Sequence, residues 1–328
     1  MFQIIQSPKV LPPKVDKVSI TYSPAVEDKD IPISWQRAHI RKAMTFLVDR
    51  KFAWAVGGRI YKSSLRVPLK NGTLLLQTDP VYANSSVFRC EFNPARLHMA
   101  DVAAVLSFVL PWGYGDLVKS GRCTRLDIAI DILGVDIEDL LVWNTTARRT
   151  RMYTGEHGRL ETYYLGSTSS PRHYVIYDKR AEMEKKGIDT YLPDGPIVRI
   201  EARLRPSVYW CDMSELTNPF AKLNVASYAS ISASDVETHL FLESCRLRGA
   251  QAALKRVKKL DASLWSKYSK RLEQHVSPWW DPEHIWAQYP DLLHELTYPS
   301  GDSAIGEKIR KTHYEQGFCP TSNVNVIL

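Results

Sequence analysis

Hydrophobic and polar side chains alternate over residues 124–132 and again over residues 198–205. Because successive side chains of a β-strand point to opposite faces, this period of two predicts two strands, each with one apolar and one polar face. Isoleucine, leucine and valine fill nearly all the apolar positions, and β-branched residues suit a pleated sheet better than a helix. The polar positions combine arginines with carboxylates and are Arg125, Asp127, Asp131, Arg199, Glu201, Arg203 and Arg205. Acid and base are therefore expected side by side on one face of a sheet.

Helical and strand patterns alternate along the rest of the chain. Helices are predicted over Ser34–Lys51, Met99–Leu110, Asp136–Trp143 and Arg180–Lys186, the last of them closed by Gly187. Further strands are predicted near Phe52–Val56, Arg59–Tyr61, Thr73–Thr78 and Val87–Phe92. This mixed order predicts an α+β fold with a mainly antiparallel central sheet, flanking helices and a basic C-terminal helical region.

Composition divides the chain into three parts. Residues 1–33 contain five prolines and predict an extended N-terminal arm or edge strand with little helix. Residues 34–230 are predicted to form the main domain. Its end is placed in the serine- and alanine-rich run 226–235, where Ser234 and Asp235 are suited to cap a helix. Residues 231–328 then form the basic helical region and the tail.

Positive charge is concentrated near the C-terminus. The chain has 43 lysines and arginines against 36 acidic residues, a net charge of +7 that suits a polyanionic partner. Residues 246–275 alone carry nine basic and two acidic side chains. Apolar positions at intervals of three, four and seven predict one helix with a single apolar stripe: Leu247, Leu254, Val257, Leu264, Tyr268 and Leu272. Lys255, Arg256, Lys258 and Lys259 of this helix are predicted to contact DNA, although ordinary solvated surface helices share the pattern.

An ordered set of short motifs surrounds Tyr177. In chain order they are Glu91-Phe92-Asn93-Pro94, Tyr164-Leu165-Gly166-Ser167, Ile176-Tyr177-Asp178-Lys179 with Glu182, and Arg199-Ile200-Glu201. Together, over roughly residues 85–206, they resemble the trans-acting rolling-circle replication initiators of small plasmids, a family shared with some filamentous phages.

The resemblance implies a DNA-nicking enzyme. Proteins of this family nick one strand at a replication origin and become joined to its 5′ end through a tyrosine, so Tyr177 is the implied nucleophile and residues 34–230 the nicking domain. The strands are later rejoined. The resemblance further implies a homodimer, a host helicase of the UvrD/PcrA type as partner, and an origin that is single-stranded at the nick and duplex nearby. The protein would act in the bacterial cytoplasm, encoded by a plasmid or a phage.

The residue types fit this chemistry. A phenol with a pKa of about 10 is a poor nucleophile unless a neighbouring group shares its proton, and Lys179 and Glu182 are the predicted assistants. A phosphodiester resists attack because it is charged, and a divalent ion, Mg²⁺ or Mn²⁺, neutralises that charge. Asp127, Asp131 and Glu201 supply the oxygen ligands that these ions prefer. Phosphate contacts are predicted for Arg125, Arg172, Arg199 and Arg203, and His173 is expected beside the site rather than as a ligand.

Some residues depart from the family pattern, and two simpler interpretations of the site residues stay open. None of the nine histidines forms the His-hydrophobe-His triplet common among nicking enzymes. Val175 stands where the family favours a basic residue, and Asp178, where asparagine is common, would oppose phenolate formation unless it binds a metal or a cation. Tyr177 could instead be a half-buried packing residue, and the two aspartates could form ion pairs with arginines of neighbouring strands.

Other classes of protein are disfavoured or kept as alternatives. A non-catalytic origin-binding or repressor protein with the same fold is the main alternative, and a metal-free tyrosine recombinase is weaker because it leaves the carboxylates without a role. The five cysteines are odd in number and widely spaced, which favours a reducing cytoplasm. No secretion signal, membrane-length apolar run or phosphate-loop motif is found, so we expect no membrane association and no helicase activity of its own.

Overall fold

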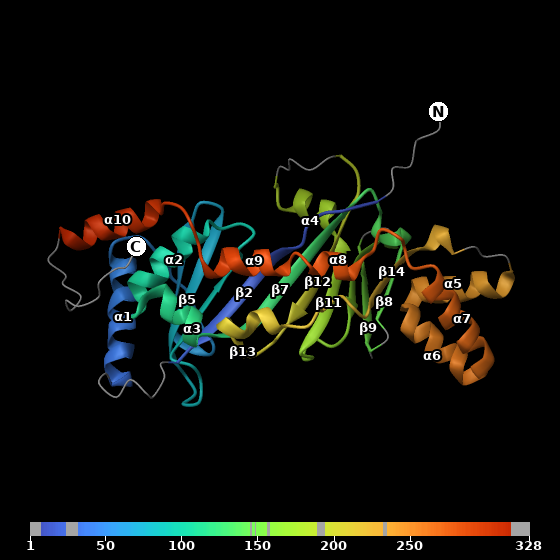
Figure 1. The fold of residues 1–328 in the computed structure, drawn as a ribbon, viewed down its shortest axis with the longest axis horizontal. Coiled ribbons are helices and arrows are strands. Elements are labelled where there is room, and N and C mark those ends of the chain that lie inside the picture. Colours follow the sequence, from blue (N-terminus) through green and yellow to red (C-terminus); the bar gives the residue numbers. More distant parts are fainter. Residues whose placement is uncertain are drawn as a thin grey trace. The chain divides into compact units, whose positions relative to one another are not determined.

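The computed structural model describes residues 8–23, 32–144, 146–147, 149–155, 158–188, 194–231 and 235–315. The chain divides into two compact units, each assembled from separate stretches of sequence (Figure 1). The first unit comprises residues 1–18, 123–208 and 212–293, and the second comprises residues 19–122, 209–211 and 294–328. The main domain predicted over residues 34–230 contributes to both units, and its boundaries stay predictions.

The first unit is built on an antiparallel sheet with the strand order β7-β12-β11-β10-β9. These strands are β7 (Arg122–Leu133), β12 (Ile197–Leu204), β11 (Arg172–Asp178), β10 (Leu160–Leu165) and β9 (Thr150–Thr154). The short β1 (Lys9–Val10) also pairs with β7. The two alternating strands expected from the sequence are thus confirmed, and they lie next to each other as β7 and β12. The α+β class with a mainly antiparallel sheet is confirmed as well.

Two regions lie on the apolar side of this sheet. Strands β8 (Leu140–Asn144) and β14 (Leu223–Ser227) form a small antiparallel sheet of their own. Beside them lie the helices α5 (Val236–Arg248), α6 (Ala250–Leu260) and α7 (Ala262–Gln274) (Figure 1). Buried side chains of β8, α5, α6 and α7 form one cluster, in which the rings of Phe241 and Tyr268 stack at 4.2 Å.

The single basic helix predicted for residues 246–275 is wrong, because the segment contains parts of three helices. Gly249 separates α5 from α6 with a φ of +82°, a backbone conformation that residues other than glycine rarely adopt. Asp261 separates α6 from α7, and its side chain accepts a hydrogen bond from the Ser263 amide as a helix cap. Leu254, Tyr268 and Leu272 are buried as predicted, but Leu247 is 73% exposed.

The helix predicted over Asp136–Trp143 is also wrong. Asp136 caps a single 3₁₀ turn, η1 (Ile137–Asp139), and β8 follows at once. All five residues of β8 are buried, and a short apolar run with both faces covered fits a strand as well as a helix. By contrast, the helix predicted after Tyr177 is confirmed as α4 (Lys179–Lys185), with Gly187 at a φ of +60° just beyond its end.

The second unit has its own antiparallel strands, in the order β3-β4-β5-β6-β2. They are β3 (Trp54–Ala55), β4 (Tyr61–Leu69), β5 (Gly72–Pro80), β6 (Phe88–Phe92) and the last residues of β2 (Lys14–Tyr22). The strands predicted near residues 52–56, 73–78 and 87–92 are confirmed, whereas the one placed at 59–61 only begins at Tyr61. Within the predicted N-terminal arm, Val18 and Ile20 of β2 are fully buried, so this part of the segment belongs to the core.

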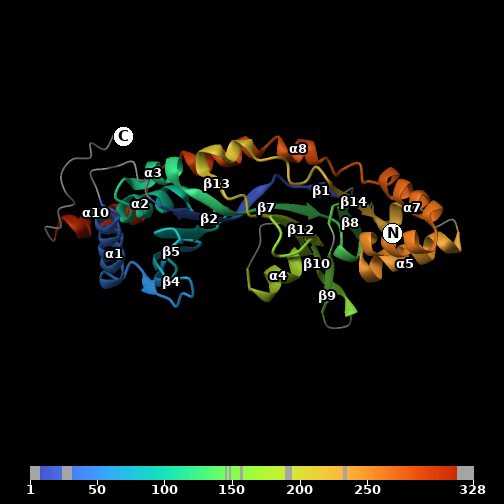
Figure 2. The same cartoon turned by 90° about the horizontal axis from the view of Figure 1, so that it is seen from below.

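Four helices complete the second unit. They are α1 (Ile33–Asp49), α2 (Met99–Val109), α3 (Gly113–Ser120) and α10 (Ala304–Tyr314). Helices α1 and α10 both lie against α2 (Figure 2). The rings of Phe46 in α1 and Phe108 in α2 are 5.3 Å apart, and His313 of α10 contacts both. Both helices predicted in this region are confirmed.

The remaining elements are short. They are β13 (Val208–Tyr209), η3 (Trp210–Glu215), η4 (Tyr228–Ser230), α8 (Pro282–Trp286) and α9 (Tyr289–Thr297). In the described part of the chain no single helix is long and apolar enough to cross a membrane. Helices α2 and α3 reach that length and composition only together, with a bend of 94° between them.

Candidate active site

The strand register of the first unit gathers polar side chains on one face of the sheet. Residues directly opposite each other on antiparallel strands share a face. Three rows cross the sheet from β7 through β12 to β11, and we call them the polar face. The rows are Asp131, Arg199 and Tyr177; Ala129, Glu201 and Val175; and Asp127, Arg203 and His173. The predicted nucleophile and all three predicted metal ligands therefore lie on the same face.

Tyr177 and Glu201 are joined directly. The Tyr177 hydroxyl donates a hydrogen bond of 2.6 Å to Oε1 of Glu201. Burial, together with the negative charge of Glu201, raises the pKa of Tyr177, so the phenol keeps its proton at neutral pH. The other oxygen of Glu201 accepts from Nε and Nη2 of Arg203 at 2.9 and 2.7 Å. The carboxylate is thus held in place, with one oxygen directed at the phenolic proton.

Lys179 and Glu182 lie in the first turn of α4, which directly follows the Tyr177 strand. The Lys179 ammonium lies over the Tyr177 ring, 5.8 Å from its centroid, and is paired with the Glu182 carboxylate. Burial, and then the charge of Arg199, lowers the pKa of Lys179. The structure therefore places Lys179 against the predicted nucleophile, while Glu182 lies behind the lysine and also pairs with Lys186.

Asp178 has a structural role that the sequence did not reveal. Its side chain accepts a hydrogen bond of 2.9 Å from the Ala181 amide and so caps α4. The carboxylate is directed at the start of the helix, where the helix dipole favours a negative charge. The acid next to Tyr177 is therefore engaged by the backbone amide of Ala181.

The two aspartates of the polar face are engaged by cations. Arg199 donates to both oxygens of Asp131, at 2.6 and 2.9 Å, and Lys14 donates to Asp131 as well. Burial alone would raise the pKa of Asp131, but the hydrogen bonds and charges of Arg199 and Lys14 outweigh it and lower the pKa. Arg125 binds Asp127 through Nε at 2.9 Å. The plainer reading of these aspartates as partners of arginine is thus what the structure shows.

This arrangement does not fit a metal ion held by all three predicted ligands. Asp127 and Asp131 are four residues apart on one strand, so their Cα atoms are about 13 Å apart, whereas Mg²⁺ needs its oxygens at about 2.1 Å. Each of the three carboxylates also accepts hydrogen bonds from arginine. Within the described ranges, no group of three or more histidine, cysteine or carboxylate side chains is placed to hold a metal ion. Metal binding by Asp127, Asp131 and Glu201 stays a prediction.

His173 lies in the third row of the polar face, beside the site as expected. Among the described residues it belongs to no group of side chains that could hold a metal ion. It is 6% exposed, and its Nδ1 has no hydrogen-bond partner among the described residues. Burial and the charges of Arg203, Arg205 and Arg125 lower its pKa to about 4. The imidazole is therefore neutral at physiological pH.

The remaining predicted DNA contacts lie elsewhere. Arg172 is opposite Leu204 in the register and so lies on the other face of the sheet from Tyr177. Lys255, Arg256, Lys258 and Lys259 are exposed on α6, where the Lys258 ammonium lies 4.8 Å from the centroid of the Trp265 ring. The structure brings Arg125, Arg199 and Arg203 to the polar face but not these five residues.

Two partners of the polar face were missed from the sequence. Lys14 binds Asp131, and Asp16 accepts from Nη1 of Arg199 at 3.1 Å. Both belong to β2, in the segment that the prolines marked as an arm. The only local signal was the alternation of Lys14 and Asp16 with the buried Val15.

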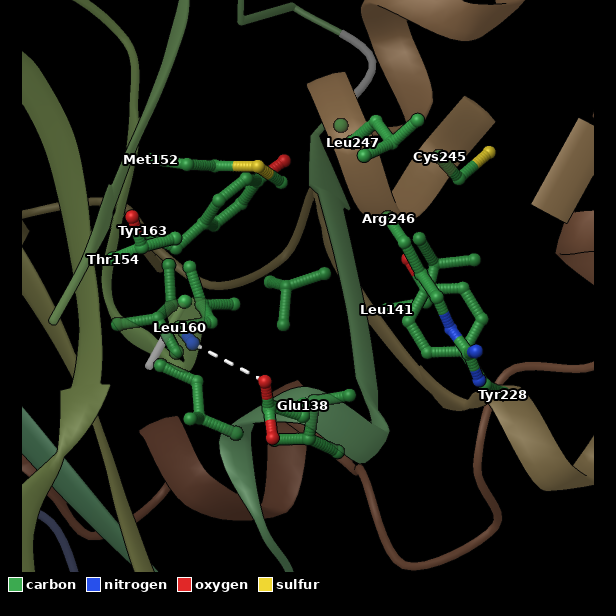
Figure 3. A pocket seen from close by; sticks show the side chains of 16 residues that line it. Glu138, Leu141, Met152, Thr154, Leu160, Tyr163, Tyr228, Cys245, Arg246 and Leu247 are labelled. Carbon is green, nitrogen blue, oxygen red and sulfur yellow. Dashed lines mark hydrogen bonds between the residues drawn. The ribbon is translucent and has the colours of Figure 1, made fainter. Parts of the chain in front are cut away.

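An apolar pocket occupies the opposite side of the same sheet (Figure 3). It has a volume of about 390 Å³ and is lined by Ile176 and Tyr163 of the sheet, Leu141 of β8 and Cys245 of α5, among other residues. Glu138 and Arg246 are its charged residues. Glu138 accepts from the Leu160 amide at 3.2 Å, and Arg246 lies over the Tyr228 ring. Burial raises the pKa of the Cys245 thiol to about 12, so this pocket offers no activated nucleophile.

Comparison with known proteins gives a partial match. No protein-family model matches the chain. Two replication initiation proteins of Staphylococcus aureus are 29% and 28% identical to it over 126 residues, and the match spans 38% of this chain and 38% of the length of each relative. A solved rolling-circle replication initiator protein from Geobacillus stearothermophilus covers 74% of this chain and 98% of its own, with a TM-score of 0.41 and 14% identity. Over these 126 residues the chain is similar to replication initiation proteins, the kind of protein that the motifs around Tyr177 resemble.

Proposed function

We propose that this protein initiates rolling-circle DNA replication by nicking one strand of an origin through Tyr177. The observation that carries the proposal is the 2.6 Å hydrogen bond from the Tyr177 hydroxyl to Glu201 on the polar face. A half-buried tyrosine held against a fixed carboxylate is the arrangement that a phenol needs to act as a nucleophile.

In the proposed step, the Tyr177 oxygen attacks a backbone phosphorus. A bond forms between phosphorus and the phenolic oxygen, the bond to the 3′ oxygen breaks, and the 5′ end stays attached to the protein. Glu201 takes the phenolic proton, and the leaving 3′ oxygen takes a proton from water to become a hydroxyl. Because the raised pKa of Tyr177 prevents a preformed phenolate, proton transfer to Glu201 must accompany the attack. The reverse reaction rejoins the strand.

Cations near Tyr177 support the transfer of a charged group. Arg199 is opposite Tyr177 in the register, and the Lys179 ammonium lies over its ring. Both would attract a phosphate brought to the tyrosine, and guanidinium groups match phosphate oxygens in geometry. The requirement for Mg²⁺ or Mn²⁺ stays a prediction, and no step above depends on it.

Several partners follow from the family resemblance alone. We expect origin DNA, single-stranded at the nick, to lie on the polar face and duplex DNA to contact the lysines of α6. A homodimer, a host helicase and a place in the bacterial cytoplasm are further expectations of the same kind.

A non-catalytic origin-binding or repressor protein is the second candidate. One observation favours it: each carboxylate of the polar face is already paired with a cation, as in a purely structural network. In that case the protein would bind DNA without forming a covalent bond to it.

A covalent-adduct assay separates the two functions. Wild type, Tyr177→Phe, Glu201→Gln and the control Tyr164→Phe, a tyrosine of the neighbouring strand on the same face, are each incubated with supercoiled DNA or oligonucleotides of the protein's own replicon. Mn²⁺, Mg²⁺ or a chelator is included in parallel. We expect an adduct with wild type and Tyr164→Phe, none with Tyr177→Phe, and about 10²- to 10⁴-fold slower formation with Glu201→Gln.

Each other outcome has a definite meaning. An adduct that persists in Tyr177→Phe moves the nucleophile to another residue. DNA binding by the wild type without any adduct favours the non-catalytic binder. Adduct formation in the presence of the chelator would contradict the predicted requirement for a divalent metal ion.

A further inference from the structure

A polar cavity of about 420 Å³ lies in the first unit at the turn between β10 and β11. Among the residues that line it are two arginines, Arg149 and Arg172, and the four hydroxyl residues Thr146, Ser167, Ser169 and Ser170. Gly166 and Ser167 come from the Tyr164-Leu165-Gly166-Ser167 motif, to which the proposed nicking step gives no role.

This cavity is separate from the polar face. Its lining residues Arg172 and Tyr174 lie on the opposite face of β11 from Tyr177. Arg172 is also five residues from Tyr177 along the strand, a distance of about 17 Å. The group that binds here is therefore not the phosphate attacked by Tyr177.

The charge of the cavity is unbalanced. Its lining includes no aspartate or glutamate, although every arginine of the three rows of the polar face has a carboxylate partner. In the described part of the chain, Arg149 makes no ion pair, and Arg172 makes only a long contact of 3.5 Å with the Pro219 carbonyl. Two guanidinium groups thus keep most of their donors available.

The acceptors in the cavity are already used internally. The Asn144 side-chain oxygen accepts from the amide and the hydroxyl of Thr146, at 2.8 and 2.6 Å. The Tyr174 hydroxyl oxygen accepts from Nδ2 of Asn144 at 3.4 Å, and its hydrogen is donated to the Pro219 carbonyl. The hydroxyls of Ser167 and Ser169 lie 2.8 Å apart and share one hydrogen bond, so one of their two hydrogens stays available. What remains for a ligand is mainly this hydrogen, the Ser170 hydroxyl and the guanidinium donors, which is the chemistry of an anion site.

Gly166 allows the chain to turn at the edge of the cavity. Its φ is +92°, and a Cβ atom there would lie 3.2 Å from the Cβ of His173. A larger residue would therefore be strained, and it would disturb the turn that presents Ser167 and Ser169.

We propose that this cavity binds a phosphate group, carried either by the DNA backbone or by a free nucleotide. Its volume lies in the range of pockets that bind nucleotide-sized molecules. Phosphate is favoured among anions because two guanidinium groups and several hydroxyls match its tetrahedral oxygens. The inference does not depend on nicking, and it gives Arg172 a DNA or nucleotide contact far from Tyr177.

The test uses the full chain with Tyr177→Phe, so that the presence or absence of nicking does not affect the result. Into this background we place Arg149→Gln, Arg172→Gln or the control Arg151→Gln, an exposed arginine of β9 that does not line the cavity. Binding is measured for inorganic phosphate and dATP by calorimetry, and for a single-stranded oligonucleotide by fluorescence anisotropy.

We expect Arg149→Gln and Arg172→Gln to weaken binding about tenfold or more, as for lost charged hydrogen bonds, and Arg151→Gln to change it less than twofold. Weaker binding of phosphate and dATP identifies a free nucleotide as the ligand. Weaker binding of the oligonucleotide alone identifies the DNA backbone. Equal effects of all three variants on every probe would overturn the proposal.

A second variant guards against loss of folding. Ser169→Asp adds a negative charge at an exposed position of the turn and leaves both arginines in place. It should weaken the same probe as Arg149→Gln while the circular-dichroism spectrum and unfolding midpoint stay those of the parent. Unchanged binding in Ser169→Asp would contradict an anion site.

Discussion

The polar face and helix α6 carry charge in opposite ways. On the polar face, Asp127, Asp131, Arg199 and Glu201 are almost fully buried and each is paired. On α6, Lys255, Arg256, Lys258 and Lys259 are exposed, and in the described part of the chain none of them forms an ion pair. Buried ions lose their hydration and depend on their partners for stabilisation. Exposed ions stay hydrated, and their attraction for distant charges is screened by salt. The first arrangement holds groups in position, and the second attracts a polyanion.

Removing one partner on the polar face should have the largest effect on stability. Arg199→Met leaves the buried Asp131 with Lys14 as its remaining partner, and breaking such a pair typically costs about 3–5 kcal/mol. Lys255→Met on α6 should change the free energy of unfolding by less than about 0.5 kcal/mol. Urea denaturation monitored by circular dichroism measures both. Equal free energies of unfolding for Arg199→Met and Lys255→Met would contradict this difference between buried and exposed charges.

The second effect depends on pH and involves His173. Its pKa in the folded protein, about 4, is below the ordinary value of 6.5, so the unfolded chain takes up the proton first as the pH falls. The stabilising contribution is complete above pH 6.5 and is lost as the pH falls towards 4. We expect the free energy of unfolding to decrease by about 2 kcal/mol over this window.

Replacing the histidine tests this origin. His173→Gln cannot be protonated, so its stability should change much less between pH 6.5 and 4. The exposed His239→Gln should retain the wild-type pH dependence. A profile for His173→Gln that parallels the wild type would assign the pH effect to other groups.

The smallest effect should be seen on α6, and only in DNA binding. Lys255→Gln with Lys259→Gln removes two exposed cations and should lower the slope of log affinity against log salt by about 1.5. The matched control is Lys308→Gln with Arg310→Gln, two exposed cations of α10 in the second unit. Anisotropy titrations at several salt concentrations measure the slopes. If both pairs lower it equally, net charge rather than α6 explains the attraction.

Sequence alone predicted the polar face but not its pairing. The alternation in β7 and β12 fixes which side chains share a face, because the period of a strand is two. It cannot fix which residues lie opposite each other, since register depends on the whole sheet. For this reason Glu201 was assigned to a metal, although the register places it opposite Val175, one row from Tyr177, where its carboxylate accepts the phenolic hydrogen bond. Whether it also binds a metal stays a prediction.

Local patterns were also ambiguous where tertiary packing decides. Residues 246–275 have a helical period throughout, yet Gly249 and Asp261 interrupt it with backbone conformations that suit a break. The apolar run at 140–144 is compatible with a helix or with a buried strand, and its pairing with β14 determines that it forms a strand. Lys14 and Asp16 were missed because the proline-rich segment was predicted as an arm or edge strand, whereas β2 lies between β6 and β7 in the sheet.

Asp178 has a consequence for the mobility of the site. It is both the last residue of β11 and the N-cap of α4, and it is the only residue between Tyr177 and Lys179. Its φ of −66° and ψ of 101° are fixed in part by the hydrogen bond to the Ala181 amide. These two backbone torsions therefore set the direction in which α4 leaves the strand, and so the position from which the Lys179 side chain reaches the phenol ring. Tyrosine and lysine are brought together mainly by chain connectivity, so little conformational entropy remains to be lost when a DNA strand arrives.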